Sequence, residues 1–123
     1  DMAKLFAEML NGAGIGAKVN PDVDHVIWAK VSFNCAMNSL CALLGTTPGP
    51  ILDSAELRDL AIATAMESCA VAAAIGIEVD REGLLKTLEL VQREHRHHKP
   101  SMLVDFLAGR PTEIDSLTGL SPL

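Results

Sequence analysis

The chain has 123 residues, enough for one domain with a single hydrophobic core. Its formal charge is −6 and its ten basic residues are scattered, which argues against binding to the phosphate backbone of nucleic acids. No apolar run approaches about eighteen residues without a polar interruption, and the start "DMAKLFAEML" lacks the apolar core of a signal peptide. We therefore expect a soluble chain that has neither nucleic acid nor membrane as a partner.

Three cysteines favour a reducing compartment. Cys35, Cys41 and Cys69 lie within apolar runs and lack CxxC spacing. This pattern is typical of small buried hydrophobic residues rather than of a disulfide or metal framework. We expect a cytoplasmic location and no metal site.

The first two predicted helices occupy the N-terminal third of the chain. The segment "MAKLFAEMLNGAG" has apolar residues at helical spacing and ends in glycines, as a helix with its stop would. After a turn, Asp22 or Asp24 can cap a long helix that runs to about Leu44. The sequence "GTTPGP" then breaks the chain and is interpreted as a loop.

Three further helices are predicted after this loop. Ser54 is expected to cap an Ala-rich, tightly packed helix that continues until Gly76. Asp80 begins the amphipathic segment "DREGLLKTLELVQREHRHH", which is followed by the short helix "SMLVDFLAG" and a polar tail. Because period-two alternation is not sustained anywhere, the sequence predicts an all-α domain of about five helices.

The second predicted helix carries three polar residues at four-residue intervals, namely Lys30, Asn34 and Asn38. Side chains at this spacing lie above one another on one helix face. The helix is otherwise apolar nearly all round, which indicates burial, and buried polar groups need hydrogen-bond partners. The stripe is therefore interpreted either as the side of a ligand-binding cleft or as a polar face that packs on a partner domain.

Two other motifs favour ordinary structural roles. "GAGIGA" lacks the GxGxxG spacing and follows a helix rather than a strand, so it is interpreted as a helix stop and not as a nucleotide-binding turn. "EHRHH", with His95, His97 and His98, lacks a completing ligand at helical spacing, so a solvated helix end is favoured over a metal site.

Ser101 and the segment after it have two interpretations each. Ser101 follows a proline and is predicted to be an N-cap, although a hydroxyl at a helix start is also a place where a carboxylate can bind. The stretch "GRPTEIDSLTG" contains Arg110, Glu113 and Asp115, and by its composition alone it would be a surface loop.

The stretches "WAKVSFNCAMNSLCALLG", "MESCAVAAAIGI" and "HKPSMLVDFLAGRPTEIDSLTG" together resemble the C-terminal domain of ketopantoate reductase (2-dehydropantoate 2-reductase). The most specific elements are the K-x-x-x-N-x-x-x-N stripe and an S-M-x-x-D…G-R-x-T-E-I-D run, in which the Ser precedes the Glu by twelve residues. The resemblance covers residues 1–123 and implies a multi-helical domain similar to the C-terminal domain of 6-phosphogluconate dehydrogenase. It also implies an N-terminal Rossmann domain that binds NADPH and is absent from this chain, which alone is expected to be inactive.

The resemblance assigns roles to five residues. Lys30 corresponds to the family's catalytic lysine, which stabilises charge on the substrate oxygen and donates a proton, and partial burial is expected to make it a better donor. Asn34 and Asn38 correspond to amides that hydrogen-bond the substrate. Ser101 corresponds to a serine that contacts the substrate carboxylate, and Glu113 to a glutamate that orients substrate and lysine. Arg110 and Asp115 are expected to fix the loop.

The function implied by the resemblance is the reduction of 2-dehydropantoate to pantoate, on the route to pantothenate and coenzyme A. A reductase of another 2-keto acid is the first alternative. The second is a catalytically silent helical module that dimerises or packs on a partner through its exposed apolar surface.

Overall fold

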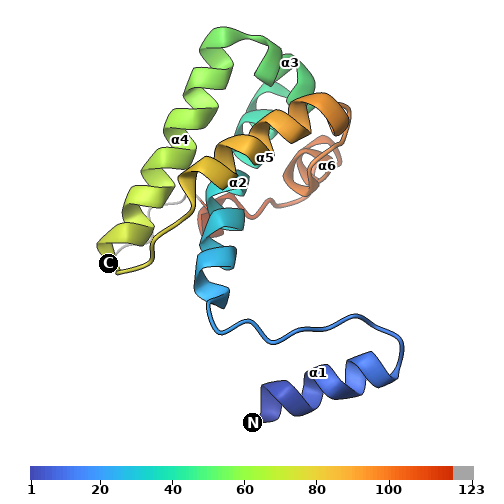
Figure 1. The fold of residues 1–123 in the computed structure, drawn as a ribbon. Helices are drawn as coiled ribbons and strands as arrows, with labels where there is room; N and C mark the ends of the chain where they lie inside the picture. The colour runs from blue at the N-terminus through green and yellow to red at the C-terminus, as the bar shows by residue number, and fades with distance from the viewer. Residues whose placement is uncertain (118–123) are drawn as a thin grey trace.

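The structure is a computed structural model that describes residues 1–117, and within them it contains seven helices and no strand (Figure 1). The helices are α1 (Met2–Gly12), α2 (Val23–Leu44), α3 (Pro48–Asp53), α4 (Ala55–Ala74), α5 (Arg81–Glu94), α6 (Ser101–Leu107) and α7 (Ile114–Leu117). The prediction of an all-α domain is confirmed.

Helix α2 is the centre of the fold and contacts α3, α4, α5, α6 and α7. Its closest partner is α4, which presents small residues at Ala61, Ala65, Cys69 and Ala72, all at most 1% exposed. Small side chains let two helix backbones approach closely and pack without gaps. Large residues from α2, α3, α5 and α6 fill the rest of the core, among them Met37, Ile51, Leu52, Leu84, Leu88, Met102 and Leu103.

By length and composition alone, α2 could cross a membrane. Its burial differs along its length, because the buried positions run from Ser32 to Ala42 whereas Val23, Val26 and Ile27 are exposed. The C-terminal half of α2 is therefore surrounded by the other helices, as in the core helix of a packed domain (Figure 1).

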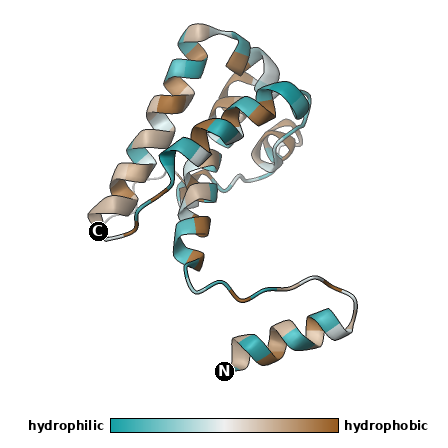
Figure 2. Cartoon of the chain, in the orientation of Figure 1, coloured by the Kyte–Doolittle hydropathy of each residue, from teal (hydrophilic) through white to brown (hydrophobic). Residues whose placement is uncertain are grey.

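Helix α1 lies apart from the other helices and is joined to α2 by an extended segment (Figure 1). It contains no buried residue, and the apolar side chains of Leu5, Phe6 and Met9 are each about three-fifths exposed. Figure 2 shows hydrophobic and hydrophilic residues alternating along α1. Its amphipathic pattern therefore predicts the helix correctly, but α1 adds nothing to the core.

The predicted helix ends are largely confirmed. The Ser54 hydroxyl accepts a hydrogen bond from the Leu57 N–H, and the Asp80 carboxylate accepts one from the Gly83 N–H. Asp22 precedes α2, but its side chain makes no capping hydrogen bond.

Two short helices were not predicted. Helix α3 starts inside the predicted "GTTPGP" loop, because Pro48 at its first position has a backbone angle suited to a helix start. Helix α7 lies in the predicted polar tail, where the Cys35 Sγ on α2 donates a hydrogen bond to the Leu117 carbonyl at 3.2 Å. Such short helices leave almost no periodic signal in a sequence.

Helix α5 ends at Glu94 rather than at the histidines that follow it. The connection to α6 instead packs on α3, where the Gly49 N–H donates a hydrogen bond to the Arg96 carbonyl at 2.9 Å. The Arg96 guanidinium also pairs with Asp53 at 2.6 Å. The segment between α5 and α6, residues 95–100, is therefore attached to α3 and does not continue the helix.

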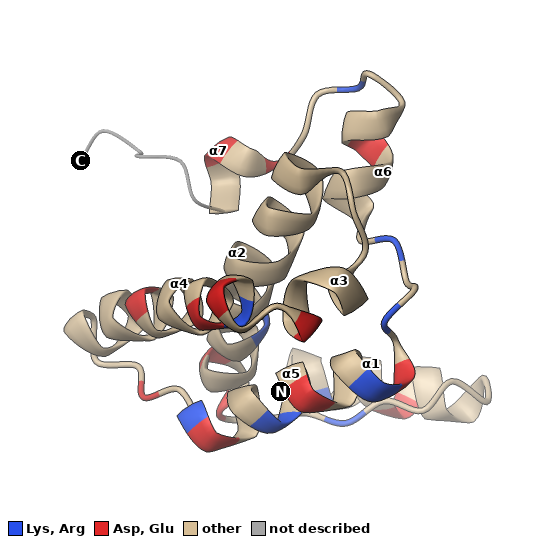
Figure 3. Cartoon of the chain, turned by 90° about the horizontal axis from the view of Figure 1, so that it is seen from above, with Lys and Arg blue, Asp and Glu red and all other residues tan. Residues whose placement is uncertain are grey.

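The charges and cysteines agree with the expectations from the sequence. Figure 3 shows Lys and Arg residues interspersed with Asp and Glu on α1 and α5. All three cysteines are buried and have free thiols. Burial raises the pKa of the Cys35 thiol above its ordinary value.

Candidate active site

The polar stripe on α2 spans the boundary between the exposed and buried halves of that helix. Lys30 is exposed, Asn34 is half-buried and Asn38 is only 6% exposed. The expected partial burial of Lys30 is wrong for this chain, because the lysine itself is exposed although its neighbours Ala29 and Val31 are partly buried. The two amides, in contrast, lie where the other helices begin to cover α2.

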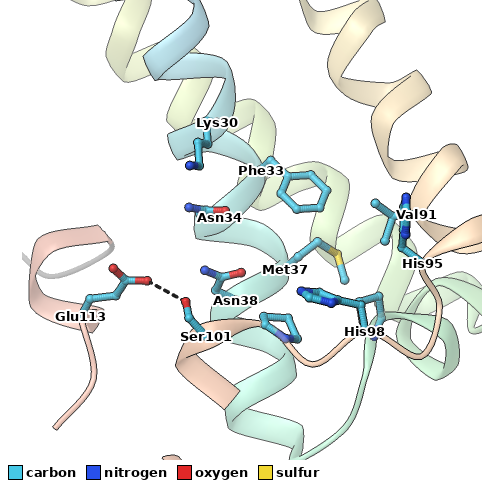
Figure 4. A pocket seen from close by; sticks show the side chains of 12 residues that line it. Lys30, Phe33, Asn34, Met37, Asn38, Val91, His95, His98, Ser101 and Glu113 are labelled. Atoms are coloured by element: carbon cyan, nitrogen blue, oxygen red, sulfur yellow. Dashed lines mark hydrogen bonds between the residues drawn. The ribbon is translucent and has the colours of Figure 1, made fainter. Parts of the chain in front are cut away.

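The stripe forms one side of an open cleft of about 710 Å³. Figure 4 shows the side chains of Lys30, Asn34 and Asn38 stacked along α2 and directed into this space, with Ser101 and Glu113 beyond Asn38. All five residues singled out from the sequence line the cleft, although they come from three separate segments. The fold therefore brings them together.

Ser101 is the first residue of α6 and not its N-cap, so the predicted capping role is wrong. The N-cap position is Pro100, which is buried and whose extended backbone precedes the helix. The Ser101 hydroxyl instead donates a long hydrogen bond of 3.5 Å to the Glu113 carboxylate (Figure 4). The serine thus faces the cleft together with an acidic partner.

Glu113 is positioned by the turn that starts α7. Its carbonyl accepts hydrogen bonds from the Ser116 and Leu117 N–H groups at 3.0 and 3.2 Å. Within residues 1–117 its side chain is hydrogen-bonded to Ser101 and not to Lys30. The predicted role of Glu113 in orienting the lysine therefore requires a substrate or a further group between them.

Arg110 has the structural role expected of it. Its guanidinium pairs with Asp105 on α6 at 2.7 Å, which ties the segment after α6 back to that helix. Asp115 lies in the first turn of α7, where an acidic side chain suits the helix dipole. Neither residue lines the cleft.

The opposite side of the cleft was not predicted. It is lined by Pro48, Val91, His95, His98 and Pro100, and the side chains of Phe33 and Met37, which belong to α2, lie between it and the stripe (Figure 4). His95 and His98 were interpreted as a solvated helix end, and both are exposed, yet they also face the cleft (Figure 4). No sequence signal placed them there, because the end of α5 and the path of residues 95–100 depend on packing against α3.

Lys30 and Phe33 also border a second hollow of about 420 Å³, which is lined mainly by α5 residues and their N-cap, including Asp80 and Thr87. The ammonium of Lys30 therefore stands between two open spaces rather than within one closed cavity. A polar group at such a position is accessible to a molecule that approaches from outside the chain.

Residues 22–120 match the family model described as "Ketopantoate reductase PanE/ApbA C terminal". The chain belongs to this family. Its stripe and its Ser–Glu pair are therefore parts of a ketopantoate reductase C-terminal domain.

Similar proteins agree with this assignment. The 2-dehydropantoate 2-reductase of Archaeoglobus fulgidus is 32% identical over 117 residues, which are 95% of this chain and 39% of that protein. The enzyme of the same name from Pyrococcus horikoshii is 35% identical over 115 residues, covering 91% of this chain and 37% of that protein. The chain thus spans less than two-fifths of the length of these relatives.

Solved structures show the same fold. A 2-dehydropantoate 2-reductase from Methylococcus capsulatus superposes with a TM-score of 0.84 at 31% identity, over 97% of this chain and 38% of that chain. A D-mandelate dehydrogenase in complex with NADH superposes with a TM-score of 0.87 at 27% identity, over 96% of this chain and 41% of that chain. The ketopantoate reductase C-terminal fold is therefore shared with an oxidoreductase of a different name.

Proposed function

We propose that this chain is the substrate-binding and catalytic half of an NADPH-dependent 2-dehydropantoate 2-reductase, a cytoplasmic enzyme of pantothenate and coenzyme A biosynthesis. The observation that carries the proposal is the convergence of Lys30, Asn34, Asn38, Ser101 and Glu113 on one cleft. The polar groups on this surface suit a small molecule that has a carboxylate, a carbonyl and a further hydroxyl.

Lys30 is the proton donor in this proposal. When the carbonyl carbon of the substrate is reduced, negative charge develops on the carbonyl oxygen. An ammonium at that oxygen stabilises the charge and donates the proton that completes the alcohol. The exposed position of Lys30, at the junction of two hollows, leaves it free to meet a substrate held between this chain and another domain.

The remaining polar residues bind and orient the keto acid. Asn34 and Asn38 each offer a donor and an acceptor along α2, and Asn38 is nearly buried. A buried amide discriminates in favour of a hydroxylated substrate, because an analogue without the hydroxyl leaves the amide unpaired. Ser101 donates its hydroxyl proton to Glu113 in the structure, and it turns that proton to the substrate carboxylate when the substrate binds.

The cofactor belongs outside the described part of this chain. Residues 1–117 contain no strand and hence no strand–glycine turn–helix unit that could hold a dinucleotide. We assign NADPH, which supplies the hydride, to an N-terminal Rossmann domain of the same protein, because the relatives are more than twice as long as this chain. The isolated chain is accordingly expected not to oxidise NADPH.

The test is steady-state NADPH oxidation by the complete protein encoded by the gene, with 2-dehydropantoate as substrate. We expect Lys30→Ala to lower kcat by about 100- to 10,000-fold, the range for loss of a general acid. Lys86→Ala is the matched control, since Lys86 is exposed on α5, where its ammonium pairs with Glu82. A wild-type protein that is inactive on every 2-keto acid would leave an interaction module as the function.

A reductase of another 2-keto acid is the second candidate. It is favoured by the similarity to D-mandelate dehydrogenase and by the apolar side of the cleft, where Phe33 and Val91 could contact an aromatic substituent. The keto acid that corresponds to mandelate therefore belongs in the substrate panel. A higher kcat/KM for that compound than for 2-dehydropantoate would select this alternative.

A further inference from the structure

His98 occupies a part of the cleft for which the proposed function has no role. It lies in the connection between α5 and α6, and Figure 4 shows its imidazole beside Met37, directed towards Asn38 and Ser101. Within residues 1–117 neither ring nitrogen has a hydrogen-bond partner. The imidazole can therefore donate to a molecule in the cleft.

The charges at this end of the cleft favour a donor in addition to Ser101 and the Asn38 amide. A substrate carboxylate next to Ser101 would also lie near Glu113, whose carboxylate is 3.5 Å from the Ser101 hydroxyl. Two carboxylates in one site repel each other unless a positive or donating group lies between them. Ser101 supplies a single O–H, whereas a carboxylate accepts up to about four hydrogen bonds.

In a 2-keto acid the carbonyl carbon is bonded to the carboxylate carbon, so the two groups lie side by side in the cleft. In the proposed function the ammonium of Lys30 is assigned to the carbonyl oxygen. The carboxylate oxygens beside it therefore need other donors. Among the residues that line the cleft, His95 and His98 are the other basic side chains, and Figure 4 places His95 beside Val91, away from Ser101.

The position of His98 is fixed by several contacts. The backbone N–H of His98 donates a hydrogen bond to the His95 carbonyl at 3.0 Å. Arg96, which lies between these two residues, is attached to α3 through contacts with Asp53 and Gly49. On the other side, Pro100 is buried. The backbone that carries His98 is therefore held in place before a ligand binds, and only the side chain has still to be ordered.

We propose that His98 is a second ligand of the substrate carboxylate, donating a hydrogen bond to it beside Ser101. This inference rests on the proposed function, because it requires a 2-keto acid in the cleft. It adds a sixth residue to the five that the resemblance assigned. Lys30 then contacts the carbonyl oxygen of the substrate, whereas His98 and Ser101 contact its carboxylate.

The test compares His98→Ala, His98→Gln and His98→Asn with wild type in the complete protein, using NADPH and the preferred 2-keto acid. We expect His98→Ala to raise KM by about 10- to 100-fold, the effect of a lost hydrogen bond to a charged group, with kcat within about twofold. At least one of the two amide variants should restore much of the KM, because each retains an N–H donor. His97→Ala is the matched control, since His97 is exposed and does not line the cleft.

A second substrate separates carboxylate binding from a general structural effect. The primary amide of the same keto acid carries no negative charge, so His98→Ala should change its kcat/KM much less than that of the acid. Equal losses for acid and amide, or wild-type KM in His98→Ala, would overturn the inference while leaving the proposed function intact. A wild-type protein inactive on all 2-keto acids would overturn both.

Discussion

Cys41 is completely buried on α2, and this burial raises the pKa of its thiol from an ordinary value of 9.0 to about 11. The cause is desolvation, because a thiolate in the core would lose its hydration without gaining a partner. The folded state therefore holds this proton at a pH where the unfolded chain releases it.

Stability is accordingly expected to fall in alkali. The raised pKa of Cys41 contributes about 2 to 3 kcal/mol to the free energy of unfolding. This contribution is fully present below about pH 9 and is lost as the pH rises towards 11. Urea denaturation at several pH values, with Cys41→Ala beside wild type, measures this. The difference in the free energy of unfolding between the two proteins should shrink from pH 8.5 to pH 11. A constant difference would contradict a raised pKa of the Cys41 thiol in the folded state.

The residues of the site were predictable only where the sequence is periodic or resembles a family. Lys30, Asn34 and Asn38 follow from their spacing on one helix, and the structure places them on one side of the cleft. His98 did not follow, since its location depends on contacts between residues distant in sequence. The expected burial of Lys30 failed because periodicity reports the face of a helix and not the position along it at which packing begins.

At the scale of elements, the capping residues determine where helices begin. Asp80 and Asp22 both precede helices, but only the Asp80 carboxylate accepts a hydrogen bond from the first turn, from the Gly83 N–H at 2.9 Å. Free N–H groups at a helix start are costly unless a side chain or water satisfies them.

The two aspartates therefore form a matched pair of test sites. We expect Asp80→Ala to lower the free energy of unfolding by about 1 kcal/mol, whereas Asp22→Ala should lower it by clearly less. Urea denaturation of the two variants gives the comparison. Equal losses would indicate that charge at the helix N-terminus, and not the hydrogen bond, is responsible.

Five of the seven helices in residues 1–117 were predictable, because each is long enough or sufficiently well delimited to show a hydrophobic period with end signals. Helices α3 and α7 have six and four residues and depend on tertiary contacts, such as the hydrogen bond from Cys35 to Leu117. The same contacts place Glu113 at the cleft. Short elements thus carry part of the site although the sequence does not reveal them.

At the scale of the whole molecule, the chain consists of a packed group of helices from α2 to α7 and the separate helix α1. The match to the family begins at residue 22, whereas the relatives match 91% or more of the chain. The similarity to the relatives therefore extends into α1, although this helix precedes the residues that define the family's C-terminal domain.

Removal of residues 1–21 should leave the core intact. We expect the remaining chain to unfold with a free energy within about 0.5 kcal/mol of the original, because α1 contains no buried residue. Urea denaturation of both chains measures this. Ala65→Leu is the control for sensitivity, since a larger side chain between α2 and α4 should cost about 1 to 3 kcal/mol. A comparable loss on truncation would show that α1 packs on the core.

The two sides of the cleft differ in their relation to folding. One side is α2, whose residues beyond the stripe build the core, so few substitutions there leave the protein stable. The other side includes exposed residues of the connection between α5 and α6, including His95 and His98, which contribute nothing to the core. In the proposed function, substitutions in that connection would therefore change substrate preference at little cost in stability, while the helix that bears Lys30 stays the same.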